Sequence, residues 1–195
     1  MKKNRFYIGF LLAALILGAC SKDDNTGNLI TEAWKLQNEQ AFNDLANNPE
    51  YTKLELQGFN GSIYYRVLQK GEGKRLYYNS RAEVYYKGWF VVTNADKNIK
   101  EGYVFDKWLF DDGVTHKVAV NPYAVDDSYI YRSVIDGWTL ALQYMVEGDK
   151  WEIRIPYRLG YGEEDYVVTN RPTIPGYSTL AFEIELVKAI DPDEF

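Results

Sequence analysis

The feature that most constrains the fold is a series of short stretches in which apolar and polar residues alternate. Successive side chains of a strand point to opposite faces of a sheet, so each stretch predicts a strand with one apolar face. A sheet of such strands is antiparallel and needs cover on one face only. The stretches are 54–56 and 63–67, on either side of the turn signal Gly58-Phe59-Asn60-Gly61, and 83–90, 150–155 and 180–187.

One stretch, Val134–Met145, breaks this alternation. Its apolar residues recur at spacings of three, four and three, which places them on one stripe of a short helix. The sequence therefore predicts an α+β body over 51–195, an antiparallel sheet with one helix laid across it. A second helix is expected within an extension over 29–50, because Leu29–Asn47 lacks Pro and Gly and is followed by Asn48-Pro49.

The first twenty residues have the layout of a secretory signal. Three positive charges precede the apolar stretch Phe6–Leu17, which is shorter than the ~20 residues that span a bilayer with ease. Leu17-Gly18-Ala19-Cys20 resembles the lipobox of bacterial lipoproteins, in which a diacylglycerol is attached to the cysteine and cleavage leaves it at the N-terminus. The resemblance implies a signal peptide over 1–19, a lipidated tether over 20–28 and Cys20 as the membrane anchor. An ordinary signal peptide with a chance cysteine is the alternative.

The segment after the cysteine, Ser21–Asn25, resembles the acidic, lysine-containing export signal of surface lipoproteins of Bacteroidetes. It implies an outer-membrane lipoprotein of the cell envelope, with the body exposed at the surface; a solvated linker is the alternative. Cleavage after residue 19 would remove three positive charges and take the formal charge from −6 to −9. An acidic body is not drawn to anionic lipid, so membrane attachment would depend on the acyl chains.

Composition excludes several classes of protein. The chain has one Cys and one His, so it cannot form an internal disulfide, a cysteine-rich metal site or a multi-histidine site. His116 is the lone candidate for the base of a triad, and no G-x-S-x-G motif accompanies it. The acidic charge does not suit a nucleic-acid binder. No cofactor motif occurs. The carboxylates of Asp111-Asp112 and Glu163–Asp165 could hold calcium, but solvated loops are the favoured interpretation, and no metal is expected.

A series of short motifs gives the functional signal. The motifs are Val84–Trp89, Val104–Asp106, Val134–Trp138, Gly148–Asp149, Ile155–Tyr157, Gly160–Gly162, Ile174–Pro175 and Thr179–Leu186. In their order and approximate spacing they resemble the FKBP-type peptidyl-prolyl isomerases over roughly Ser62 to Ile190. That family implies a half-barrel sheet wrapped around one helix, with a pocket between helix and sheet, and proline-containing polypeptides as substrates. Macrolide-type ligands are further candidates.

The resemblance assigns a role to each residue at a pocket position. Trp138 would form the floor under the proline ring. Tyr86, Phe105 and Phe182 would form the walls. Ile135 would offer its backbone N–H, and Tyr161 its hydroxyl, to carbonyls of the substrate. Ile174 would line the rim, and His116 or Val118 falls where the family commonly has Phe. The matched pocket positions are Tyr86, Phe105, Asp106, Val134, Ile135, Trp138, Tyr161 and Phe182.

Prolyl isomerisation suits a chain that is poor in His and Cys, because no proton has to move. The barrier of ~18–20 kcal/mol comes from amide resonance, and the two isomers differ by only about 0.5–1 kcal/mol. An apolar aromatic pocket disfavours the polar planar amide relative to the twisted one. Two alternatives stay open: an FKBP-like peptide-binding or chaperone module with little or no turnover, and a surface glycan-binding lipoprotein whose exposed aromatic residues stack on sugars.

Overall fold

The computed structural model describes residues 24–96, 98–109, 113–121 and 130–194. The predicted signal peptide, Cys20 and Asp111-Asp112 lie outside the described residues. No helix in the described ranges is long and apolar enough to cross a membrane.

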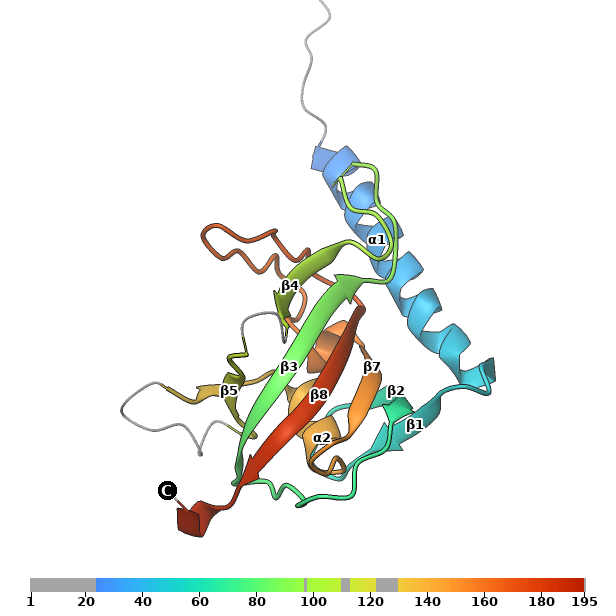
Figure 1. Ribbon diagram of the computed structural model, residues 1–195. Helices are drawn as coiled ribbons and strands as arrows, with labels where there is room; N and C mark the ends of the chain where they lie inside the picture. Colours follow the sequence, from blue (N-terminus) through green and yellow to red (C-terminus); the bar gives the residue numbers. More distant parts are fainter. Residues whose placement is uncertain (1–23, 97, 110–112, 122–129, 195) are drawn as a thin grey trace, which may run out of the picture.

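The body is an eight-stranded sheet in the order β1-β2-β7-β8-β3-β5-β6, with β4 paired to β3 off this path (Figure 1). The predicted alternating stretches all lie on or beside these strands. Every pair is antiparallel except β5 with β6, which run parallel over two residues, so the sheet is mixed. The strands are β1 Thr52–Glu55, β2 Ser62–Gln69, β3 Arg81–Phe90, β4 Val104–Trp108, β5 His116–Ala119, β6 Arg132–Ser133, β7 Lys150–Ile155 and β8 Leu180–Ile190.

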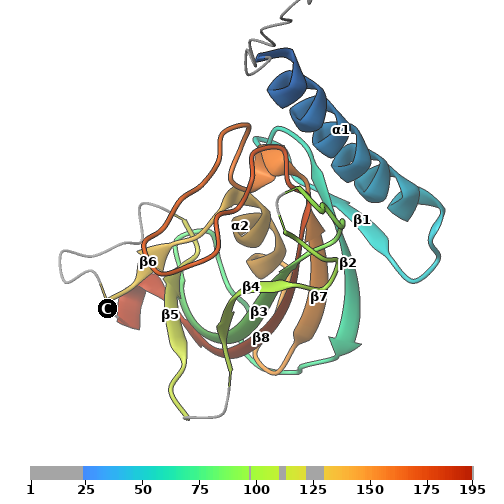
Figure 2. The ribbon, with the colours of Figure 1, turned by 90° about the horizontal axis from the view of Figure 1, so that it is seen from above.

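The centre of the sheet is the long pairing of β3 with β8. It runs from Arg81 opposite Ile190 to Phe90 opposite Leu180, with one register shift after Glu83. The sheet curves around the helix α2, Asp136–Leu142, which lies against its concave face (Figure 2). This helix is shorter than the predicted stretch, but six of its seven residues are buried. The core therefore lies between α2 and the sheet, as the alternation and the apolar stripe predict.

A glycine sets how closely α2 approaches the sheet. A Cβ atom at Gly137 would lie 2.5 Å from Cγ2 of Ile155 on β7, which is closer than real side chains come. Only glycine permits this separation, so the first turn of α2 sits directly on β7. The position of α2 in turn fixes the side chain of Trp138, the next residue along.

The N-terminal helix α1 spans Asp24–Asn43 and continues as the 3-10 turn η1, Asp44–Asn47. It begins five residues before the predicted start, so residues 24–28 of the predicted tether are helical. Once a helix has formed, each further residue adds a hydrogen bond at little extra cost, which lets α1 extend through Gly27. The rest of α1 agrees with the predicted helix, and it packs against one side of the body (Figure 1).

Candidate functional site

The structure brings four of the predicted rings together between α2 and the sheet. The Trp138 ring on α2 meets Tyr86 of β3 and Phe182 of β8 edge to face, with ring centroids 5.2 and 5.3 Å apart. Phe105 of β4 meets Phe182 in the same way at 5.5 Å. Each of these side chains is at most 6% exposed. Trp138 thus lies at right angles to two rings of the sheet, in the arrangement expected of a floor and two walls.

Gly88 on β3 makes room for this cluster. A Cβ atom there would lie 2.6 Å from Cε1 of Phe182 and 2.8 Å from Cζ of Phe105. Both rings therefore lie on the backbone of β3 at the one position without a side chain. In the sequence Gly88 stands out only as a member of the apolar alternation of its strand, and this role was not predicted. A glycine in a strand interior is the signal that could have revealed it, since it often marks a close approach.

A carboxylate, that of Asp106, stands beside the rings and has two side-chain partners. The Tyr86 hydroxyl donates a hydrogen bond to Oδ2 of Asp106 over 2.8 Å, and Nη1 of Arg171 donates to the same oxygen over 2.6 Å. Burial, reinforced by the Asp106 carboxylate, raises the pKa of the Tyr86 hydroxyl well above its ordinary value. Tyr86 therefore stays protonated. Oδ2 of Asp106 thus accepts from two side chains, one on β3 and one in the loop 163–178.

Arg171 was not among the predicted site residues. It belongs to the long loop 163–178, and its side chain reaches back to β4 from 65 residues further along the chain. Pairing at this distance in sequence leaves no local pattern that could have revealed it. In this ion pair the Arg171 side chain is half-exposed and the Asp106 side chain is largely buried. Because exposed ion pairs contribute little to the free energy of folding, the main effect of this pair is to fix the position of the loop.

Two hydrogen-bond donors lie next to the rings without a partner in the described ranges. Tyr161 is half-buried, its ring stacks on Tyr166 at 4.4 Å, and burial raises the pKa of its hydroxyl to about 12. Its O–H makes no hydrogen bond there. Ile135 is the N-cap of α2, and its carbonyl accepts the N–H groups of Trp138 and Thr139. Its own N–H makes none. Both donors are thus available for the roles that the sequence predicts.

The remaining predicted residues border the rings. Val134 is half-buried and packs on the core cluster beside Ile135. His116 on β5 lies between Tyr86 and Trp108, with ring centroids 5.3 and 5.1 Å away. Burial lowers the pKa of His116 below its ordinary value, so the ring is neutral at pH 7. Val118, the other candidate for this position, is fully buried in the core. The residue that contacts the Tyr86 ring is therefore His116.

Ile174 is buried, and the loop that carries it is tightly closed. Ile174 and Tyr166 exchange two backbone hydrogen bonds across the loop, and the N–H of Tyr177 donates to the carbonyl of Gly162 at its base. Two of the carboxylates that could have held calcium are engaged inside this loop. Glu163 accepts from the Tyr177 hydroxyl, and Asp165 accepts from the N–H of Gly176.

Carboxylates elsewhere in the described residues do not suggest a metal site either. Asp191, Asp193 and Glu194 lie close enough to share an ion. However, the ammonium group of Lys74 pairs with both Asp191 and Glu194, and so fills the position that a cation would take.

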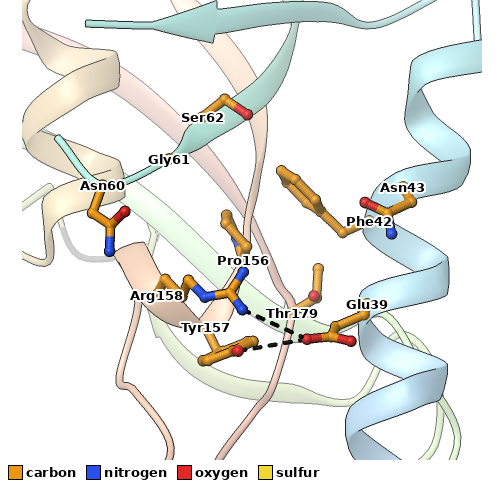
Figure 3. Close-up of a pocket in the computed structure, with 10 residues that line it drawn as sticks. All are labelled: Glu39, Phe42, Asn43, Asn60, Gly61, Ser62, Pro156, Tyr157, Arg158 and Thr179. Atoms are coloured by element: carbon orange, nitrogen blue, oxygen red, sulfur yellow. Dashed lines mark hydrogen bonds and ion pairs between the residues drawn. The ribbon is translucent and has the colours of Figure 1, made fainter. Parts of the chain in front are cut away.

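Two pockets lie along α1, away from the predicted site. The larger has a volume of about 410 Å³ and lies between α1 and the body, where Glu39, Phe42 and Arg158 point into it (Figure 3). The smaller, of about 300 Å³, lies between α1 and residues 93–96. Neither is lined by a predicted site residue. Their existence indicates that α1 is docked on the body at a few points rather than along its whole length.

With this geometry in place, comparison with known proteins decides the family. The family model of the FKBP-type peptidyl-prolyl cis-trans isomerases matches residues 73–187, more than half of the chain. The chain belongs to this family. The match begins after α1, β1 and β2, and it includes every residue of the predicted FKBP pocket. The recognition of the family from its motifs is thereby confirmed.

Individual FKBP relatives agree. The chain is 30% identical to the macrophage infectivity potentiator of Trypanosoma cruzi over 174 residues, 89% of this chain and 71% of that protein. It is 33% identical to the FKBP-type 22 kDa peptidyl-prolyl cis-trans isomerase of Escherichia coli over 128 residues, 66% of this chain. The aligned part is 50% of the E. coli protein, so the chain spans about half the length of that relative.

Solved structures confirm the predicted FKBP fold. A peptidyl-prolyl cis-trans isomerase of Pseudomonas syringae pv. tomato matches with a TM-score of 0.59 and 28% identity, over 83% of this chain and 96% of that one. FkpA of Escherichia coli matches with a TM-score of 0.60 over 85% of this chain and 63% of that one. At 22% identity, the second likeness supports the fold alone.

Proposed function

We propose that this chain is a peptidyl-prolyl cis-trans isomerase that assists the folding of extracytoplasmic proteins, and that the prolyl bond turns at the ring cluster of Tyr86, Phe105, Trp138 and Phe182. The observation that carries the proposal is the pair of free donors beside these rings. The Ile135 N–H and the Tyr161 hydroxyl have no partner in the described part of the chain, although both lie at the edge of a buried aromatic cluster.

The chemistry follows from what each part does to a prolyl amide. The planar amide is polar because of resonance, and twisting it about the C–N bond removes that resonance. Aromatic walls exclude water. The polar planar ground state therefore loses more solvation free energy in the site than the less polar twisted state does. Donors that hold the carbonyls beside the proline then favour the twisted geometry over the planar one. No residue has to give or take a proton, which suits a site whose one imidazole is neutral at pH 7.

The substrates in this proposal are proline-containing polypeptides. Prolyl isomerisation takes tens of seconds without a catalyst and can limit folding, so a chain that meets unfolded proteins outside the cytoplasm would accelerate their slowest step. Macrolide-type ligands are a second class of occupant for the same rings. The long loop 163–178 closes one side of the site through Arg171 and Ile174, so we expect peptides to bind better than bulky macrolides.

The location is proposed from the first twenty residues. A lipid on Cys20 would hold the chain at the cell envelope as an outer-membrane lipoprotein, with Ser21–Asn25 as the signal for surface export. Replacing Cys20 by Ser in the full chain tests this directly. The unchanged chain should fractionate with outer membranes and take up labelled palmitate, whereas Cys20→Ser should do neither. Equal membrane association of the two chains would rule out the lipid anchor.

A protease-coupled assay tests the activity. The protein should comprise residues 21–195, which contain every described element, and the substrate should be a short peptide whose trans prolyl form is cleaved by chymotrypsin. At micromolar protein the slow phase should accelerate, and Trp138→Leu should abolish most of the gain. Thermal unfolding of both proteins shows whether the variant is folded. A slow phase that stays at the uncatalysed rate would refute the enzymatic proposal.

The second candidate is a peptide-binding module without useful turnover, which the low exposure of the four rings favours. Their mutual edge-to-face contacts leave little open aromatic surface for a proline. In that case a proline peptide should bind the chain, and binding should be lost in Trp138→Leu, without any change in the rate of isomerisation. The two candidates are therefore separated by measuring binding and rate on the same peptide.

A further inference from the structure

The helix α1 lies outside the part of the chain that the family model matches, yet two of its residues are buried in the body. Trp34 is 1% exposed and Asn38 is fully buried. They are one helical turn apart and therefore lie on the same face of α1. The other residues of the helix whose exposure is known are half-buried or exposed. The fully buried contacts of α1 with the body are thus made by one aromatic and one amide side chain.

Both residues make hydrogen bonds with one short segment of the body. Nε1 of Trp34 donates to the carbonyl of Gly176 over 2.9 Å. Oδ1 of Asn38 accepts from the N–H of Thr179 over 2.8 Å, and the Thr179 hydroxyl donates to the Asn38 carbonyl over 2.9 Å. Nδ2 of Asn38 donates to the Trp34 carbonyl over 2.8 Å. A buried amide with its polar groups satisfied in this way is costly to disturb, because each lost bond leaves a buried partner unpaired.

The segment that α1 holds is the base of the loop 163–178. A Cβ atom at Gly176 would lie 1.9 Å from the Glu163 carbonyl oxygen, so the two ends of the loop touch backbone to backbone. The N–H of Tyr177 donates to Gly162, the residue after Tyr161. The base therefore connects directly to the Tyr161 donor, while Arg171 near the tip pairs with Asp106.

We propose that α1 is a positioning element of the site: Trp34 and Asn38 fix the base of the loop 163–178, and the loop in turn keeps Tyr161, Ile174 and Arg171 in place beside the rings. The inference rests on the proposed function, since these three residues matter only if a peptide binds there. Without the two buried contacts, the loop would have to be ordered by the incoming peptide, and that ordering entropy would weaken substrate binding.

The test uses the full chain with two substitutions and one control. Trp34→Phe keeps an aromatic ring but removes the donor to Gly176, and Asn38→Ala removes both side-chain bonds of the amide. Leu36→Ala is the matched control, because Leu36 lies between them on α1 and is 67% exposed. Amide hydrogen exchange is measured along the chain, and kcat and KM are measured with a proline peptide.

The expected result is local. In both substituted chains the amides of Gly176, Tyr177 and Thr179 should exchange about tenfold faster, the order expected when a buried hydrogen bond is lost, while the β3–β8 amides and the Leu36→Ala control stay unchanged. KM should rise by about fivefold, because the incoming peptide would then have to order the loop, and kcat should change less. A purely structural role for α1 would instead speed exchange throughout the body.

Two results would overturn the inference: unchanged exchange of the loop in a folded Trp34→Phe chain, or an increase spread evenly over loop and sheet. If Asn38→Ala does not fold, Trp34→Phe decides alone, because it retains the packing of the ring. If the unsubstituted chain proves inactive, the proposed function fails. The exchange pattern then still decides whether α1 holds the loop, so the two failures are distinguishable.

Discussion

The hydroxyl of Tyr86 and the carboxylate of Asp106 are joined by a hydrogen bond of 2.8 Å that links two neighbouring strands across the ring cluster. Oδ2 of Asp106 also accepts from Arg171, so one oxygen connects β3, β4 and the long loop. The pair fixes the orientation of the Tyr86 ring, whose centroid lies 5.2 Å from that of Trp138. A charged group thereby orders the aromatic site without taking part in proton transfer.

Removing the hydroxyl from this pair should cost stability and activity together. Tyr86→Phe keeps the ring but leaves Oδ2 of Asp106 with Arg171 alone, and a hydrogen bond to a charged group contributes about 1.5–3 kcal/mol. We expect the free energy of unfolding to fall by about 2 kcal/mol in denaturant titration. We expect kcat/KM to fall severalfold, since the wall is no longer held. Tyr144→Phe, at an exposed tyrosine, is the control and should change neither quantity. An unchanged stability in Tyr86→Phe would contradict the role of the pair.

Tyr161→Phe should affect activity without affecting stability. The hydroxyl has no partner in the described residues, so its loss breaks no bond in the folded chain, and the unfolding free energy should stay within about 0.5 kcal/mol. If the hydroxyl holds a substrate carbonyl in the transition state, kcat/KM should fall by about tenfold, the equivalent of one hydrogen bond. Equal activity of Tyr161→Phe and the unsubstituted chain would remove Tyr161 from the site.

A single methyl group added at Gly88 of β3 should disrupt the packing of the ring cluster. The new Cβ would overlap Phe182 and Phe105, and forcing extra volume into a packed site costs about 1–3 kcal/mol. Gly88→Ala should therefore lower the melting temperature and reduce kcat/KM strongly. Gly27→Ala is the matched control, because Gly27 has open space around it on α1 and alanine favours a helix. A Gly88→Ala chain with full activity would show that the rings are free to move.

Stability should depend on the protonation of His116 between pH 7.5 and 5.5. Burial lowers its pKa; Arg171 and Arg132 add to this effect, and Asp106 opposes it. As pH falls through about 6.5, the unfolded chain takes up a proton at this residue that the folded chain does not yet bind. The folded state therefore loses stability as the pH decreases across this range. His116→Gln should lose less over the same range, as measured by thermal unfolding at both pH values. A steeper loss in His116→Gln would mean that the folded pKa is raised instead.

The sheet and its central helix could be predicted because each leaves a local periodicity. Alternation in 83–90 and 180–187 gave β3 and β8, and spacings of three and four gave α2. The two-residue parallel pairing of β5 and β6 could not be predicted, because it is too short to have a period. The start of α1 was placed late because Gly27 and Asn28 are typical of a linker. Helix propagation outweighed that local preference.

The candidate site was partly visible in the sequence for a different reason. The rings, Asp106 and Tyr161 stand in ordered motifs, and the structure brings them to one place. Arg171 and Asn38 carry no such signal, because each acts through a partner far along the chain. Polar side chains of this kind are expected at the surface. Only the tertiary contacts reveal that Arg171 pairs with Asp106 beside the rings and that Asn38 is buried against the base of the loop.

The central claim is that a prolyl bond isomerises at the ring cluster, and the most direct test is NMR exchange spectroscopy on a proline peptide in the presence of the chain. The method needs no protease, and it observes cis and trans resonances in the same sample. We predict exchange cross-peaks at a molar excess of peptide, shifts of the Trp138 indole signal on peptide addition, and loss of both in Trp138→Leu. Peptide resonances that stay in slow exchange, with the indole signal unmoved, would contradict the account.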